Sequence, residues 1–122
     1  YELILSKIRE EGADSLFVFP LFINAKYNDV LANFTLENRL PSMCQASRCI
    51  DSGGLLYYYA DILDVRRRAA VYVDKIIKGA KPASLPIEQP TKFTFVINLK
   101  TAKQIVLIIP PNVLARADRV IK

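Results

Sequence analysis

The amino-acid sequence predicts an α/β fold in which a mainly parallel sheet is flanked by helices. Short apolar runs typical of strands alternate along the whole chain with amphipathic segments typical of helices. The first of these runs, within "DSLFVFPLF" at residues 14–22, is nearly all apolar, as in a strand buried on both faces of a parallel sheet. At 122 residues the chain is long enough to bury a core. We therefore expect one α/β domain spanning residues 1–122.

The first half of the chain opens with a predicted helix, "YELILSKIREEG", with Leu3, Ile4 and Ile8 as its apolar stripe and Gly12 at its end. The apolar strand follows and stops at Pro20. The next expected elements are a helix from Asn24 or Asn28 to about Asn38 with Val30, Leu31 and Phe34 at helical spacing, a strand in "RLPSMCQA", a helical turn in "SRCIDSGG" and a strand in "LLYYY".

The second half contains the longest periodic segment, a predicted helix from Asp61 to Lys78 that Gly79 ends. Its apolar stripe consists of Ile62, Val65, Ala69, Tyr72 with Val73, and Ile76. The proline-containing residues 80–92 are expected to form an extended, hinge-like connector. The remaining predicted elements are a strand in "FTFVINL", a short helix in "KTAKQI", a break at "IIPPN" and a last helix, or helix plus strand, in "NVLARADRVI".

The composition is that of a globular chain, with 52% hydrophobic and 24% charged residues. Seventeen Lys and Arg against twelve Asp and Glu leave a formal net charge of +5. Because this excess is modest, we expect the charges to be dispersed over the surface rather than to mark a site for an acidic partner. No apolar run approaches about eighteen residues, so the sequence predicts no membrane span. The chain begins with Tyr1 rather than Met and predicts a helix at once, so we expect it to be part of a longer gene product.

Two cysteines, Cys44 and Cys49, stand five residues apart. Without histidine or further cysteines they cannot complete a structural zinc site, and we expect no metal and no cofactor. In an oxidising compartment they could form a disulfide, although spacing alone does not establish the geometry. We favour two free, partly buried thiols.

The stretch "LLYYYADILDVRRR" sets three tyrosines ahead of three arginines, the two ingredients of a groove for single-stranded nucleic acid. On a helix each residue advances by about 100°, so Arg66, Arg67 and Arg68 fan over roughly 200° and cannot form one phosphate-tracking stripe. Arg68 follows Asp64 at the spacing of an i,i+4 ion pair, whereas Arg66 lies beside the apolar stripe, where it snorkels or pairs with a carboxylate across a packing interface. We expect no nucleic-acid partner.

The tyrosines alternate faces on a strand, with Tyr57 and Tyr59 on one side and Tyr58 on the other. They lie just before a helix, at the carboxyl end of a strand, where open α/β sheets bind ligands. A tyrosine ring with its one hydroxyl suits an aromatic or amphipathic small molecule. The alternative is that one or two of these rings fill the core or an interface, and both interpretations stay open.

Several common catalytic arrangements are missing from this sequence. Without histidine there is no Ser-His-Asp or Cys-His arrangement, and "DSGG" lacks the Gly-Lys-Ser/Thr ending of a phosphate loop. No spacing of the carboxylates argues for a catalytic pair. The sequence gives no positive case for an enzyme.

Four stretches from residue 53 onward are distinctive: "GGLLYYYAD", "RRRAAVYVDKIIKGAKPASLPIEQPTKF", "FVINLKTAK" and "IPPNVLARADRVI". Through them, most of residues 53–122 resembles the C-terminal part of the periplasmic substrate-binding components of ABC transporters. The branch is the one that includes tryptophan/tyrosine-type binding proteins. The first fifty residues resemble this family more loosely, through "LFVFP" and "NRLPSM".

The resemblance implies a Rossmann-like sheet that forms part of the C-terminal lobe of a two-lobed periplasmic-binding-protein fold. Such a protein closes on a small, often amino-acid-like solute and hands it to an ABC permease in the membrane, without catalysis. The resemblance also implies a periplasmic or extracytoplasmic location. For this chain we expect Tyr57 and Tyr58 to face the ligand, with Phe19 and Phe22 as weaker apolar wall candidates.

Several residues depart from the family pattern. Relatives usually have "GGLMSYGP" where this chain has "GGLLYYYA", so Tyr58 matches the family tyrosine while Tyr57 replaces a serine and Tyr59 a glycine. Two alternatives also stay open beside the transport function. The chain could be the ligand-sensing domain of a transcription regulator, or a self-associating fragment that forms a homodimer and binds no ligand.

Overall fold

The computed structural model describes residues 2–19 and 26–122. The chain divides into two compact units. Unit 1 comprises Tyr1–Tyr59 with Phe95–Lys122, and unit 2 comprises Ala60–Thr94. The expectation of a single domain over residues 1–122 stays a prediction.

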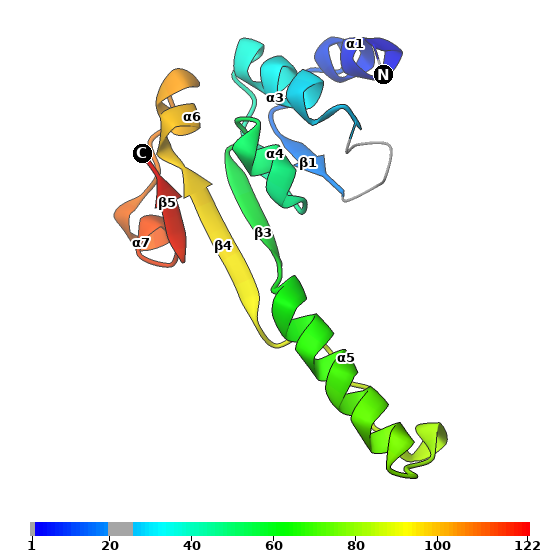
Figure 1. Cartoon of the computed structure of the whole chain (residues 1–122). Coiled ribbons are helices and arrows are strands. Elements are labelled where there is room, and N and C mark those ends of the chain that lie inside the picture. Colours follow the sequence, from blue (N-terminus) through cyan, green and yellow to red (C-terminus); the bar gives the residue numbers. More distant parts are fainter. Residues whose placement is uncertain (1, 20–25) are drawn as a thin grey trace. The chain divides into compact units, whose positions relative to one another are not determined.

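A five-stranded sheet carries the fold, in the order β1-β2-β3-β4-β5 (Figure 1). Its strands are β1 (Leu16–Val18), β2 (Ser42–Cys44), β3 (Leu56–Ala60), β4 (Phe93–Asn98) and β5 (Arg119–Ile121). Strands β1, β2 and β3 are parallel, and so are β4 and β5. Between β3 and β4 the direction reverses, because the Asn98 N–H donates to the Leu55 carbonyl while Tyr58 contacts Phe95. The predicted α/β fold with a mainly parallel sheet is confirmed.

The helices of unit 1 are α1 (Glu2–Glu10), α3 (Asn28–Glu37), α4 (Ser47–Asp51), α6 (Leu99–Gln104) and α7 (Pro111–Leu114). Helix α6 begins where the Asn98 side chain accepts a hydrogen bond from the Thr101 N–H. The last predicted segment is a helix followed by a strand, α7 and β5, which are joined to β4 by reciprocal hydrogen bonds between Phe95 and Asp118.

Helices α1, α3 and α4 pack on one face of the parallel strands. The core there consists of Leu5, Val18, Leu31, Phe34, Leu40, Cys44 and Cys49. The predicted apolar stripe of α1 is wrong in part, because Leu5 is buried and Ile8 packs beside it while Leu3 and Ile4 are exposed. Leu5 and Ile8 are three residues apart and so share a helix face that Leu3 does not.

Strand β1 was expected to be buried on both faces, and this expectation is wrong. Val18 is buried against the helices, but Phe17 points to the opposite face and is exposed. The reason is that α1, α3 and α4 pack on the Val18 face, whereas on the opposite face the neighbouring strands β2 and β3 also present partly exposed side chains.

The two cysteines are buried and joined by a disulfide, with their Cα atoms 6.1 Å apart. The preference for free thiols is therefore wrong. The bond connects the end of β2 to α4, and Gly54 passes close to it. A Cβ built on Gly54 would lie 2.9 Å from the Cys44 sulfur and 2.8 Å from the Cys49 carbonyl oxygen. The backbone can pass here because Gly54 has no side chain.

Unit 2 is built from α5 (Ile62–Ile77), the 3₁₀ turn η1 (Pro82–Ser84) and an extended segment over residues 85–92. The helix matches its predicted bounds to within one residue at each end. The Asp61 carboxylate caps it by accepting hydrogen bonds from the N–H groups of Leu63 and Asp64, and Gly79 follows its end at a φ of +100°. The hinge-like role of residues 80–92 stays a prediction.

Candidate functional site

The carboxyl ends of β1, β2 and β3 meet at one edge of the sheet because the three strands are parallel. Each strand leads from this edge toward a helix, so the edge collects the starts of α3 and α4 together with the tyrosines at the end of β3. Open α/β sheets bind ligands at such edges.

Tyr58 belongs to a sheet face that the three parallel strands share. The register pairs Phe17 with Met43 and Met43 with Leu56, so these side chains point to the same face. Tyr58 follows Leu56 by two residues and points the same way. Its side chain is 41% exposed.

Four rings form what we call the aromatic face: Phe17, Phe19, Tyr58 and Phe95. Tyr58 and Phe95 meet edge to face with ring centroids 6.0 Å apart, and Phe17 and Phe19 do so at 4.8 Å. The sequence did not identify Phe17 or Phe95 as site candidates. Because Phe17 and Phe19 are two residues apart, the sequence could have indicated that they share one face of the sheet. The position of Phe95 beside Tyr58 could be found only from the strand register.

Tyr57 points to the opposite face from Tyr58. It lies next to Cys44 in the register of β2 and β3, on the face that α1, α3 and α4 cover, and it is half-buried. The two tyrosines expected to face a ligand thus have different surroundings. The ligand-facing role of Tyr57 and Tyr58 stays a prediction.

Of the two phenylalanine candidates, Phe19 and Phe22, only Phe19 lies within the described residues. Phe19 follows β1 directly, is 58% exposed and contacts the Phe17 ring edge to face. It shares the aromatic face with Tyr58, two strands away. Phe22 lies outside the described residues.

A polar pocket of about 300 Å³ lies between α3 and α4, which start at the same sheet edge. It is lined by Lys26, Asn28, Asp29, Arg48, Asp51 and Ser52. The lining offers two cations and two carboxylates, so it can contact charged groups of either sign. Sequence reasoning missed this cluster because its members come from two segments, residues 26–29 and 48–52, that are far apart in the sequence.

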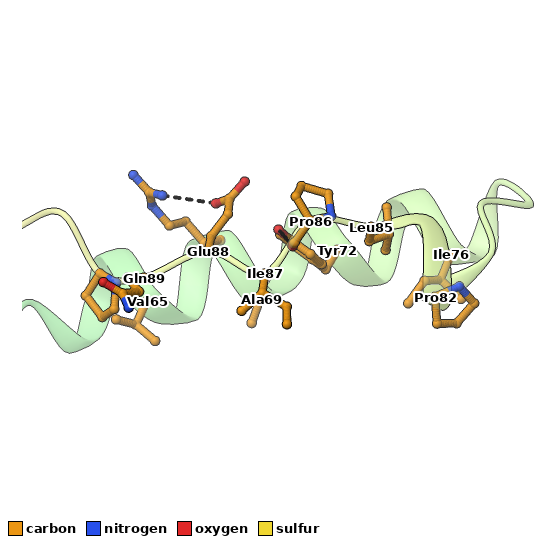
Figure 2. A pocket seen from close by; sticks show the side chains of 12 residues that line it. Val65, Ala69, Tyr72, Ile76, Pro82, Leu85, Pro86, Ile87, Glu88 and Gln89 are labelled. Atoms are coloured by element: carbon orange, nitrogen blue, oxygen red, sulfur yellow. Dashed lines mark hydrogen bonds and ion pairs between the residues drawn. The ribbon is translucent and has the colours of Figure 1, made fainter.

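A second pocket, of about 420 Å³, lies within unit 2 between α5 and the extended segment (Figure 2). Val65, Ala69, Tyr72 and Ile76 line it from the helix, and Leu85 with Pro86 and their neighbours line it from the extended segment. The predicted apolar stripe of α5 is thus partly covered by the chain's own connector.

Polar contacts hold the connector beside α5. Arg68 donates to the carboxylates of Asp64 and Glu88 and to the Thr91 hydroxyl, at 3.1, 3.0 and 2.8 Å. The predicted pairs Asp64–Arg68 and Asp74–Lys78 are both present. Arg68, one of the three consecutive arginines, therefore holds the extended segment beside α5. This agrees with the prediction that the three side chains point in different directions around the helix.

Tyr72 completes this interface. Its hydroxyl donates a hydrogen bond to the Pro86 carbonyl oxygen. Desolvation raises the pKa of the Tyr72 phenol, and the nearby Glu88 carboxylate raises it further. The neutral phenol is the form that the interface stabilises.

Across residues 2–19 and 26–122, no group of three His, Cys, Asp or Glu side chains could hold a metal ion. Within the same residues, no helix is long and apolar enough to span a membrane.

Comparison with solved structures places this fold. The chain superimposes on a conserved domain protein from Vibrio cholerae with a TM-score of 0.82 and 24% identity, covering 95% of this chain and 39% of that one. It superimposes on an ABC domain in complex with L-Trp from Streptococcus pneumonia with a TM-score of 0.81 and 25% identity, covering 98% and 41%. A ligand-free, open substrate-binding protein with adhesive properties from Clostridium difficile gives a TM-score of 0.73 and 16% identity, covering 99% and 41%.

The chain therefore spans about two fifths of the length of the solved structures that it matches. A search of curated protein sequences gives no match. The family model described as ABC transporter substrate binding protein matches residues 2–121, nearly the whole chain. The resemblance found in the sequence is confirmed: the chain belongs to the ABC transporter substrate-binding protein family.

Proposed function

We propose that this chain is part of the solute-binding component of an ABC uptake transporter, and that it binds a small amino-acid-like or aromatic molecule without catalysis. The observation that carries the proposal is the family match over residues 2–121. In this function the protein would present its solute to an ABC permease and would act outside the cytoplasmic membrane.

The aromatic face supports an aromatic solute. Tyr58 and Phe19 are both exposed at the edge where open α/β sheets bind ligands, and Tyr58 is the tyrosine that matches the family pattern. Stacked aromatic rings favour each other by about 0.5–1.5 kcal/mol beyond the area that they bury. The L-Trp-bound neighbour from Streptococcus pneumonia agrees with such a solute.

Two further features are compatible with an amino-acid-like molecule. The polar pocket between α3 and α4 offers charges of both signs, as a zwitterion requires. Tyr57 adds a half-buried ring on the same face of the sheet as these helices. Of the alternatives raised by the sequence, the family match favours transport over a ligand-sensing domain of a transcription regulator.

The test is isothermal titration of the full-length protein against a panel of amino acids that includes the aromatic ones. We expect saturable binding of at least one aromatic or other apolar amino acid. Failure of every amino acid to bind, together with clear binding of a nucleotide or a metal ion, would contradict the proposal.

A further inference from the structure

The disulfide between Cys44 and Cys49 lies where three segments of unit 1 meet. Cys44 is the last residue of β2, and Cys49 is in the middle of α4. The third segment is the backbone at Gly54, which leads into β3 and whose N–H donates to the Cys49 carbonyl oxygen at 2.8 Å. The two cysteines are 0% and 3% exposed, so the bond belongs to the core of the unit.

The surroundings of the bond leave its two sulfur atoms little room to separate. A Cβ built on Gly54 would lie 2.9 Å from the Cys44 sulfur and 3.1 Å from the Cys49 sulfur, so the backbone itself closes this side. The same core cluster contains Val18 and Phe34. Two thiols keep the van der Waals separation that bonded sulfur atoms do not, and protein cores are close-packed. Breaking the bond therefore shifts α4 or the backbone at Gly54.

The bond closes a short segment, residues 45–48, that turns from β2 into α4 at the carboxyl edge of the parallel strands. The Gln45 N–H donates to the Val18 carbonyl oxygen at 3.3 Å, and the Cys49 N–H donates to the Ala46 carbonyl oxygen at 3.0 Å. Helix α4 has only five residues, and a helix of this length is not stable by itself. Its position therefore depends on its tertiary attachments, among which the disulfide is the covalent one.

Arg48 is the residue through which this segment can act on a solute. It follows the turn directly, is exposed, and lines the polar pocket between α3 and α4 together with Lys26 and Asp29. A guanidinium group binds a carboxylate best through two parallel hydrogen bonds, a geometry that tolerates little displacement. A cation that is already held in place binds more tightly than one that binding must first order.

We propose that the disulfide between Cys44 and Cys49 positions Arg48 for the carboxylate of an amino-acid-like solute, so that the affinity for the solute depends on this bond. Both cysteines are positioning residues, because their burial keeps them from touching a solute themselves. The inference rests on the proposed solute-binding function and adds to it a covalent requirement for the binding geometry.

Trypsin reports the position of Arg48 without any solute, since it cleaves after this residue only when the surrounding backbone opens. The full-length wild type is compared with the Cys44→Ser/Cys49→Ser variant, and the fragments are separated after reduction. We expect cleavage after Arg48 to be at least about tenfold faster in the variant, while cleavage after Arg67 in α5 is unchanged. Equal rates after Arg48 in the two proteins would overturn the proposal. An equal rise after both arginines would also overturn it, because it would indicate global unfolding.

The second readout is the affinity for L-tryptophan, measured by isothermal titration. We expect the variant and the reduced wild type to bind at least about tenfold more weakly than the oxidised wild type, and reoxidation to restore only the wild type. In an Arg48→Ala background, loss of the two cysteines should cost no further affinity, because the bond acts through Arg48. Fully additive losses in the triple variant would contradict this positioning role.

Leu5→Ala separates positioning from a general loss of stability. Leu5 belongs to the same core cluster but lies on α1, and its truncation is expected to lower the melting temperature at least as much as loss of the disulfide does. It should nevertheless keep the wild-type affinity and the wild-type resistance after Arg48. A loss of affinity equal to that of the double variant would contradict the proposal. If the wild type does not bind L-tryptophan, that result counts against the proposed function, and the trypsin comparison still decides whether the bond positions Arg48.

Discussion

The guanidinium group of Arg68 lies 3.0 Å from the carboxylate of Glu88 and so joins α5 to an extended segment twenty residues further along the chain. The same guanidinium contacts Asp64 one helical turn before it and the Thr91 hydroxyl. A single side chain thus satisfies three polar groups of unit 2. Of the three consecutive arginines, Arg68 therefore has a structural role within unit 2.

Replacing Arg68 with alanine is expected to destabilise the protein by about 1 kcal/mol. The contacts of Arg68 are partly exposed and screened by water, and an exposed ion pair contributes only about 0–1 kcal/mol to stability. The contributions of the three contacts do not add fully, because all three share one side chain. Urea unfolding measures the change. Arg67→Ala serves as the control and should stay within about 0.5 kcal/mol. Equal effects of the two substitutions would contradict the bracing role of Arg68.

The phenol of Tyr72 is expected to titrate at a higher pH than an ordinary tyrosine, because desolvation and the Glu88 carboxylate raise its pKa. A folded-state pKa above the unfolded value means that the stabilisation is fully present below pH about 10 and is lost as the pH rises through the folded pKa. The ultraviolet absorbance of tyrosinate, measured as the difference between wild type and Tyr72→Phe, reports this titration. A Tyr72 signal below the range of the other tyrosines would contradict the expectation.

Gly54→Ala is expected to destabilise the protein by about 1–3 kcal/mol, since the added methyl group would meet the Cys44 and Cys49 sulfurs and the Cys49 carbonyl at about 3 Å. Gly12→Ala is the comparison, because a Cβ there meets no atom within 4 Å and only the positive φ of +67° is unfavourable. Chemical denaturation of both variants should rank Gly54→Ala as the more damaging. The reverse order would show that the disulfide region adapts freely.

Reducing the bond between Cys44 and Cys49 is expected to lower stability by about 2 kcal/mol, because a disulfide that closes a short loop restricts the unfolded chain only modestly. Unfolding midpoints measured with and without a reductant give this value. The Cys44→Ser/Cys49→Ser double variant should match the reduced protein and should not respond to reductant. A response of the double variant would show that the reductant acts elsewhere.

The order and type of the elements followed from the sequence, because each depends on local patterns. The helix over α5 was placed to within one residue by its periodicity, by Asp61 as its cap and by Gly79 after its end. The sequence predicted the burial of individual residues less accurately. Leu5 was missed because two neighbouring apolar residues, Leu3 and Ile4, suggested a stripe that tertiary packing did not use.

Long-range relationships could not be predicted in the same way. The reversal of direction between β3 and β4, and with it the contact between Tyr58 and Phe95, depends on strand register that a single sequence does not encode locally. The disulfide could not be predicted because it requires a short distance between the Cα atoms of Cys44 and Cys49, and a separation of five residues in the sequence does not determine that distance.

The candidate site was predicted in part. The position of the tyrosines at a strand's carboxyl end came from the sequence, and the structure adds that Tyr57 and Tyr58 point to opposite faces of the sheet. Phe17 and Phe95, which complete the aromatic face, and the polar pocket between α3 and α4 required the three-dimensional arrangement.

The most direct test of the proposed function is a titration of the full-length protein with L-tryptophan, comparing wild type with Tyr58→Ala and Tyr58→Phe. Melting temperatures of the three proteins show whether each variant is folded. If the ring of Tyr58 contacts the solute, Tyr58→Ala weakens binding by about tenfold or more, because one aromatic contact contributes about 1.4 kcal/mol, while Tyr58→Phe keeps most of the affinity. Binding of L-tryptophan with equal affinity by all three folded proteins would contradict the assignment of the aromatic face as the solute site.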